Sequence, residues 1–141
     1  MVDKRFISSY IYGIKCNTTN SLYIGSSFVP FNIRLSKHRT DMRGNMGELK
    51  CYRGYRASLD VMINENYESF VIEDFPCLSR EQLHTREAQY IIKYRSEGID
   101  VVNKRLPIKM DNINLIHCFY RMTCNFRHLF LFFFKINKLI T

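Results

Sequence analysis

The sequence predicts an α/β fold of the α+β kind, in which a small three-stranded, mostly antiparallel sheet is flanked by helices in the order β-β-α-α-β-α. Three observations lead to this prediction. A strand–turn–strand pattern occupies residues 6–25, a single alternating segment occupies residues 67–75, and helical patterns lie between and after them. The chain of 141 residues suits one domain, or one domain followed by a tail.

The first two strands are predicted to form a hairpin. Residues 6–16, FISSYIYGIKC, are rich in β-branched and aromatic residues and alternate in character, which is typical of a strand. Residues 17–21, NTTNS, indicate a turn, because Asn and Ser side chains bond to the local backbone and Asn tolerates left-handed backbone angles. The returning strand covers residues 22–25, LYIG.

Two helices are predicted after the hairpin. Pro30 suits the first turn of a helix, where its missing N–H costs little, and apolar residues at helical spacing extend the pattern over residues 30–43. Arg34 and His38 lie four residues apart on this helix, so they share one face. Helical spacing of apolar residues predicts a second helix over residues 54–65.

The third strand and the last helix complete the pattern. Residues 67–75, YESFVIEDF, alternate in the manner of a strand. Ser79 followed by Gln82 matches a capping box, which predicts that a helix begins here. This helix is expected to run over residues 79–97, and Gly98 suits the left-handed position just beyond its end.

Residues 1–107 are predicted to form one folded domain, whose sheet leaves one face open for functional side chains. Residues 108–141 are predicted to form a basic, aromatic-rich tail. The longest uninterrupted apolar run of the tail, residues 129–134, is much shorter than the roughly 20 residues that span a bilayer. The tail is therefore either a helix that packs on the domain, a partner or a membrane surface, or a poorly ordered extension.

Charge and cysteine content narrow the class of protein. The net charge of +8, from 21 Lys and Arg against 13 Asp and Glu, favours a polyanionic partner, either nucleic acid or an anionic membrane surface. The five cysteines form no CxxC pair and have no zinc-ligand spacing, so a structural zinc site is not expected. Because the N-terminus lacks a long apolar segment, we expect an intracellular protein of the cytoplasm or nucleus, not secreted, with free thiols.

Five polar or titratable side chains stand out as candidates for chemistry. Tyr12 and Tyr23 fall on the paired strands, Arg34 and His38 on the helix that follows, and Glu87 in the middle of the last helix. The presence of each residue also has an ordinary structural explanation. Tyrosine is common in strands, an arginine or histidine on a helix is often solvated, and a mid-helix carboxylate often pairs with a nearby cation.

The order of these residues resembles that of the GIY-YIG nuclease superfamily over about residues 7–105. The matching residues, in chain order, are Tyr10-Ile11-Tyr12, Tyr23-Ile24-Gly25, Arg34, His38, Glu87 and Asn103. The YIG tripeptide is intact and is followed by Ser26, whereas Tyr10 stands where the family has its first glycine. The full set in this order is far more specific than either tripeptide alone.

The resemblance implies a Mg²⁺-dependent (or Mn²⁺-dependent) DNA endonuclease of the homing type, with no small-molecule cofactor. It implies that Glu87 is the single metal ligand, which is sufficient because Mg²⁺ keeps several waters and also binds phosphate oxygens. Arg34 would bind the scissile phosphate. Tyr12 would be the general base, with Tyr23 beside it, although a free tyrosine has a pKa of about 10 and needs help to lose its proton. His38 would assist proton transfer or contact the phosphate.

The resemblance also implies supporting roles and leaves alternatives open. Gly25 and Asn103 would support the site, and Lys37 and Arg39 would contact DNA phosphates without sequence specificity. The alternative to an enzyme is a catalytically inactive nucleic-acid-binding module of the same fold. A third reading makes the tail an anchor to a membrane or to a protein partner, and of these two the membrane is not favoured.

Overall fold

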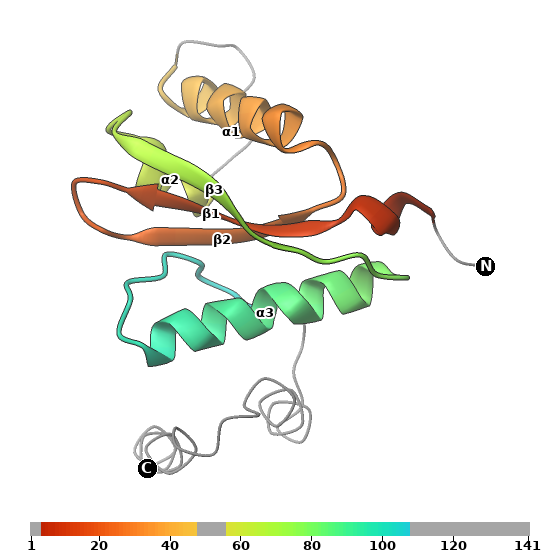
Figure 1. The fold of residues 1–141 in the computed structure, drawn as a ribbon. Coiled ribbons are helices and arrows are strands. Elements are labelled where there is room, and N and C mark those ends of the chain that lie inside the picture. Colours follow the sequence, from red (N-terminus) through yellow and green to blue (C-terminus); the bar gives the residue numbers. More distant parts are fainter. Residues whose placement is uncertain (1–3, 48–55, 108–141) are drawn as a thin grey trace. The chain divides into compact units, whose positions relative to one another are not determined.

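The computed structural model describes residues 4–47 and 56–107 (Figure 1). Its elements, in chain order, are the 3-10 helix η1 (Lys4–Ser8), β1 (Tyr10–Cys16), β2 (Leu22–Ser27), α1 (Phe31–Asn45), α2 (Ser58–Met62), β3 (Tyr67–Asp74) and α3 (Arg80–Ser96).

The predicted fold class and the predicted order of strands and helices are confirmed. The predictions for the tail fall outside the described residues. No helix in the described ranges combines the length and the apolar character that crossing a membrane requires.

The sheet has the order β2-β1-β3, so the first strand lies in the centre. β1 pairs antiparallel with both neighbours, and the register against β2 places Tyr12 opposite Gly25. The outer edge of β2 is partly covered by the segment that follows α3, because Leu22 N donates to Asp100 O at 2.8 Å and Val102 N donates to Leu22 O at 3.0 Å. Val101 therefore forms an isolated parallel bridge with Leu22 of β2.

Two apolar cores lie on opposite sides of β1. The side chains of Tyr12 and Ile14 pack with Met62 of α2 in one core, whereas Ile11 packs with Ile91 of α3 in the other. Figure 1 shows the same arrangement, with α1 and α2 on one face of the sheet and α3 on the other. The expectation that the sheet leaves one face open is wrong for β1, because helices cover both of its faces.

Several element boundaries differ from the predicted ones. The first strand begins at Tyr10 and not at residue 6, because Phe6 is turned into the core and the Ser9 hydroxyl and amide both bond to the Phe6 carbonyl in a tight turn. The strand β2 extends two residues further than predicted, to Ser27, and α1 likewise extends to Asn45. The helix α2 is short, so the prediction of a helix over residues 54–65 was too long within its described part.

The last helix begins and ends as its sequence predicts. Ser79 has an extended backbone conformation, and its side chain accepts a hydrogen bond from Gln82 N at 3.3 Å. In a standard capping box the Gln82 side chain would accept from the backbone N–H of the N-cap residue, Ser79. Here Gln82 Oε1 instead accepts from the N–H of the preceding residue, Leu78, at 2.8 Å. Gly98 has a φ of +84°, the left-handed conformation expected beyond the end of the helix. These two ends determine where α3 presents Glu87.

Candidate active site

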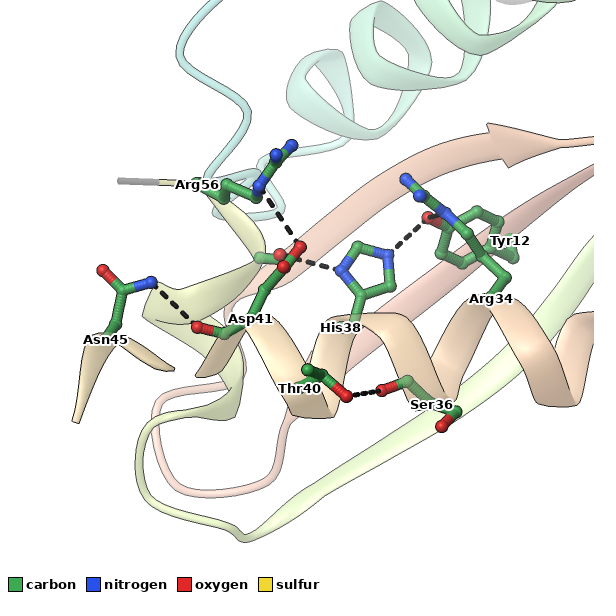
Figure 2. A network of polar contacts seen from close by, with 9 residues as sticks. Tyr12, Arg34, Ser36, His38, Thr40, Asp41, Asn45 and Arg56 are labelled. Atoms are coloured by element: carbon green, nitrogen blue, oxygen red, sulfur yellow. Dashed lines mark hydrogen bonds and ion pairs between the residues drawn. The ribbon is translucent and has the colours of Figure 1, made fainter. Parts of the chain in front are cut away.

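The Tyr12 hydroxyl lies at the centre of a buried network of side chains. Tyr12 is fully buried on β1, and its Oη accepts a hydrogen bond from Arg34 Nε at 2.9 Å. The same oxygen lies 2.7 Å from His38 Nε2 (Figure 2). The two α1 residues thus converge on one phenol oxygen, as their four-residue spacing predicts. The hydroxyl of a buried tyrosine that has only a structural role needs one hydrogen-bond partner, whereas the Tyr12 hydroxyl has more than one.

His38 is held from both sides of its ring. The side chain is only 3% exposed, its Nε2 faces Tyr12, and its Nδ1 lies 3.0 Å from Ser58 Oγ at the start of α2. Burial, and then the charges of Arg34, Arg56 and Lys37, lower the pKa of His38 to about 3. The imidazole is therefore neutral at pH 7 in the free protein, with one unprotonated ring nitrogen, and it binds a proton more weakly than a free imidazole does.

Both tyrosines of the site hold their protons firmly in the free protein. Burial raises the pKa of Tyr12 well above 10, and the positive charge of Arg34 offsets only part of this effect. Burial also raises the pKa of Tyr23, and the Glu87 charge adds to it. The Tyr23 ring lies beside Tyr12 and meets His38 edge-on, with ring centroids 5.6 Å apart. The neighbouring arginine alone therefore does not convert Tyr12 into a phenolate.

Glu87 enters the site from α3. Ser26 Oγ, at the end of β2, donates to Glu87 Oε2 at 2.6 Å, which fixes the orientation of the carboxyl group. Burial raises the pKa of Glu87, and the Ser26 hydrogen bond and the Arg34 charge oppose this rise. The Glu87 charge raises the pKa of both tyrosines, which places the carboxylate within electrostatic reach of the Tyr12 network.

The absence of a side chain at Gly25 makes room for the Tyr12 ring. A Cβ atom at residue 25 would lie 2.6 Å from both Cζ and Oη of Tyr12, a distance that no side chain can occupy. The two residues are paired across β1 and β2, so the phenol ring lies directly over the glycine. This contact gives a physical reason for glycine in the YIG tripeptide, where the backbone conformation alone does not require it.

We expect Gly25→Ala to displace Tyr12 and to weaken both the fold and any cleavage. Overpacking of this kind costs typically about 1–3 kcal/mol in unfolding free energy. Thermal unfolding and cleavage rates would be measured together. The matched control is Gly13→Ala, whose added Cβ meets mainly the tip of the Phe70 side chain on the opposite face of the sheet. Equal rates for the two variants would contradict the role of Gly25 beneath Tyr12.

Asn103 completes the outer edge of β2 at the YIG tripeptide. Its side chain is buried, Oδ1 accepts from Ile24 N at 2.9 Å, and Nδ2 donates to Ile24 O at 2.7 Å. The amide thus reproduces the pair of hydrogen bonds that another strand would make. Arg95 in turn bonds to the backbone carbonyl of Asn103. The Asn103 contacts hold the residue between Tyr23 and Gly25 in place.

The other predicted residues lie around this network and not in it. Arg39 Nε donates to Tyr67 Oη on β3 at 3.0 Å, and Lys37 lines a shallow groove along the exposed side of α1. Tyr10, at which the sequence differs from the pattern that it resembles, donates through its hydroxyl to Val29 O at 2.6 Å and packs edge-on against Phe31. Tyr10 therefore anchors the connection from β2 to α1, while Tyr12 lies in the centre of the site.

Two serines of the site were given no role from the sequence. Ser26 was noted only as the residue that follows the YIG tripeptide, and that adjacency was a usable signal. Ser58 carries no signal, because a serine near the start of a predicted helix is ordinary and its partner His38 is 20 residues away. Only the packing of α2 against β1 and α1 brings the two together.

The donor atoms of the site suit a metal ion that needs few protein ligands. In the described part of the chain, no three His, Cys, Asp or Glu side chains gather in a way that holds a metal ion. A lone carboxylate is nevertheless adequate for Mg²⁺ or Mn²⁺ bound mostly by waters and phosphate oxygens. Glu87 fits such a site, because it is a half-buried carboxylate with a fixed orientation near Tyr12 and Arg34.

Comparisons with known proteins give one structural match. No family model matches the chain, and no curated protein matches it. The structure is similar to a solved structure of the catalytic domain of homing endonuclease I-TevI, with 22% sequence identity and a TM-score of 0.49. The match covers 68% of this chain and 99% of that chain.

Proposed function

We propose that this chain is a GIY-YIG-type DNA endonuclease that hydrolyses phosphodiester bonds with the help of Mg²⁺ or Mn²⁺. The observation that carries the proposal is the Tyr12 hydroxyl, held between the Arg34 guanidinium and the neutral His38 imidazole. Glu87 lies within electrostatic reach of the same hydroxyl. A structural core has no need to gather an arginine, a histidine and a carboxylate around one buried phenol, since burying charged groups is costly.

A proton relay from water through Tyr12 to His38 fits this geometry. The attacking water gives a proton to Tyr12 Oη while the Tyr12 hydroxyl proton passes to His38 Nε2, 2.7 Å away. The water oxygen bonds to phosphorus, the bond from phosphorus to the leaving oxygen breaks, and that oxygen takes a proton from solvent. His38 then returns its proton to Tyr12 Oη, and the proton that Tyr12 took from the water passes to solvent. Because the proton moves through Tyr12 in one concerted step, the raised pKa of Tyr12 does not prevent the reaction.

Positive charge binds the substrate and balances the developing negative charge. Arg34 donates to Tyr12 through Nε and also hydrogen-bonds with Tyr23, and its positive charge would bind the scissile phosphate. A bound phosphate beside Arg34 also raises the pKa of His38, because an anion offsets the cations that lower it. Lys37 and Arg39 on the exposed side of α1, and the net charge of +8, favour contacts along the DNA backbone.

Glu87 would hold the metal ion, with its orientation set by Ser26. When bound, the ion supplies positive charge against the phosphate and the leaving oxygen. Burial raises the pKa of Glu87, and a cation bound there would stabilise the ionised form of the carboxyl group.

A nicking assay on supercoiled plasmid tests the proposal. We expect the full chain to relax the plasmid with Mg²⁺ or Mn²⁺ and to lose this activity in EDTA, while gel-shift measurements in EDTA still show binding to DNA. An inactive nucleic-acid-binding module would bind without nicking under every condition, and that result would contradict the enzyme. Undiminished cleavage in EDTA would contradict the metal requirement.

A further inference from the structure

The role of His38 in the relay depends on which ring nitrogen carries its proton. The relay requires Nε2 to be unprotonated, because that nitrogen faces the Tyr12 hydroxyl. A neutral imidazole exists in two tautomers, and the partner of the other nitrogen selects between them. His38 is buried, so water does not make this selection.

The hydrogen bonds of Tyr12 favour one tautomer. Tyr12 Oη is bonded to Arg34 Nε and His38 Nε2, and the Tyr23 side chain also hydrogen-bonds with Tyr12. A guanidinium nitrogen only donates, so Arg34 cannot take the Tyr12 hydroxyl proton, whereas an unprotonated His38 Nε2 can accept it. In that arrangement the proton of the neutral His38 ring lies on Nδ1, and Nδ1 donates to Ser58 Oγ at 3.0 Å.

We propose that Ser58 is a positioning residue that holds His38 in the tautomer with the proton on Nδ1, so that Nε2 is ready to take the proton of Tyr12. Ser58 is only 1% exposed, which protects this hydrogen bond from competition with water. The catalytic effect of Ser58 depends on the proposed nuclease function. The tautomer of His38 depends only on the geometry of its hydrogen bonds. It also gives the short helix α2 a function, because α2 brings the serine to the histidine.

The same contact matters after the proton has moved. Once Nε2 is protonated, His38 is an imidazolium with two N–H donors, and both need acceptors in a buried site. Tyr12 Oη accepts from Nε2 and Ser58 Oγ accepts from Nδ1. Without the serine, the charged ring would have one unsatisfied donor at the moment when proton transfer is needed. Loss of the hydroxyl therefore affects the rate of reaction more than the binding of DNA.

Nitrogen NMR of the histidine rings tests the tautomer directly, on the full chain at pH 7 without DNA or metal. The His38 signal is identified by its absence in His38→Gln. We expect wild-type His38 to carry its proton on Nδ1 and Ser58→Ala to shift the ring toward the tautomer with the proton on Nε2. A wild-type ring protonated on Nε2 would overturn the proposal, whether or not the variant folds and whether or not the chain cuts DNA.

Cleavage kinetics test the consequence. Loss of a residue that orients a functional histidine typically costs about 10- to 100-fold, so we expect Ser58→Ala to lower kcat by this factor with little change in KM. Ser58→Thr keeps the hydroxyl and is expected to restore the tautomer and most of the rate. The matched control is Ser9→Ala, which removes another buried hydroxyl that bonds to the Phe6 and Phe75 carbonyls. An altered tautomer with an unchanged rate would also refute the role of Ser58.

Discussion

Glu87→Gln is expected to abolish cleavage in Mg²⁺ while leaving DNA binding nearly intact. The amide keeps the size of the carboxyl group but loses the negative charge that would hold the ion. Metal ions typically contribute several kcal/mol to such transition states, and 1.36 kcal/mol corresponds to a tenfold change in rate. A loss of at least about 10³-fold is therefore expected. Single-turnover plasmid nicking measures the rate, and a gel shift measures binding.

The control for Glu87 is a second carboxylate on the same helix. Glu81 lies in the first turn of α3 and is exposed, so Glu81→Gln changes the charge equally but at a site without proposed function. We expect this variant to cut DNA at close to the wild-type rate. If Glu87→Gln cuts as fast as wild type in Mg²⁺, then Glu87 does not hold the metal ion.

Tyr12→Phe is expected to lower the cleavage rate by about 10²- to 10⁴-fold, the range typical for loss of a general base. The substitution keeps the ring above Gly25 and removes only the oxygen that joins Arg34 to His38. The buried His38 and the partly buried Arg34 then lose a partner, so the unfolding free energy is also expected to fall, by about 1–3 kcal/mol. Rates and thermal unfolding would be measured on the same samples, so that a folding defect is recognised.

Tyr10→Phe is the matched control for this prediction. Tyr10 lies on the same strand, is nearly as buried, and also loses one hydrogen bond of its hydroxyl, which donates to Val29 O. It belongs to the connection before α1 and not to the relay. We therefore expect a comparable change in stability with a rate within a few-fold of wild type. A similar fall in rate for both variants would remove Tyr12 from its proposed position as the base.

The raised pKa of Tyr12 changes how this residue is expected to act. A tyrosine with a lowered pKa would exist partly as phenolate before the substrate arrives. Here burial outweighs the charge of Arg34, so the residue stays protonated and can accept a proton only while giving its own away. His38, neutral at pH 7, is the group that receives it. The proposed site therefore acts as a connected pair, and neither residue alone explains proton transfer.

Much of the fold was predictable from local signals. The hairpin, the alternation of residues 67–75, and the Ser79 and Gly98 ends of the last helix each depend on a few neighbouring residues, and the structure confirms all of them. The start of the first strand was predicted wrongly, because residues 6–9 have strand-like composition but Phe6 is drawn into the core by a tight turn. Composition does not reveal such a turn when its hydrogen bonds involve the backbone.

The sequence by itself determined the fold class, the order of the elements and the residues that deserve attention, because strand periodicity, helix caps and the four-residue spacing of Arg34 and His38 are local. Tertiary structure alone decided what those residues touch. It buried both faces of β1, brought Ser26 to Glu87, and placed Ser58 against His38. The physical reason is that packing between distant segments sets the burial, the hydrogen-bond partners and hence the pKa values of the site.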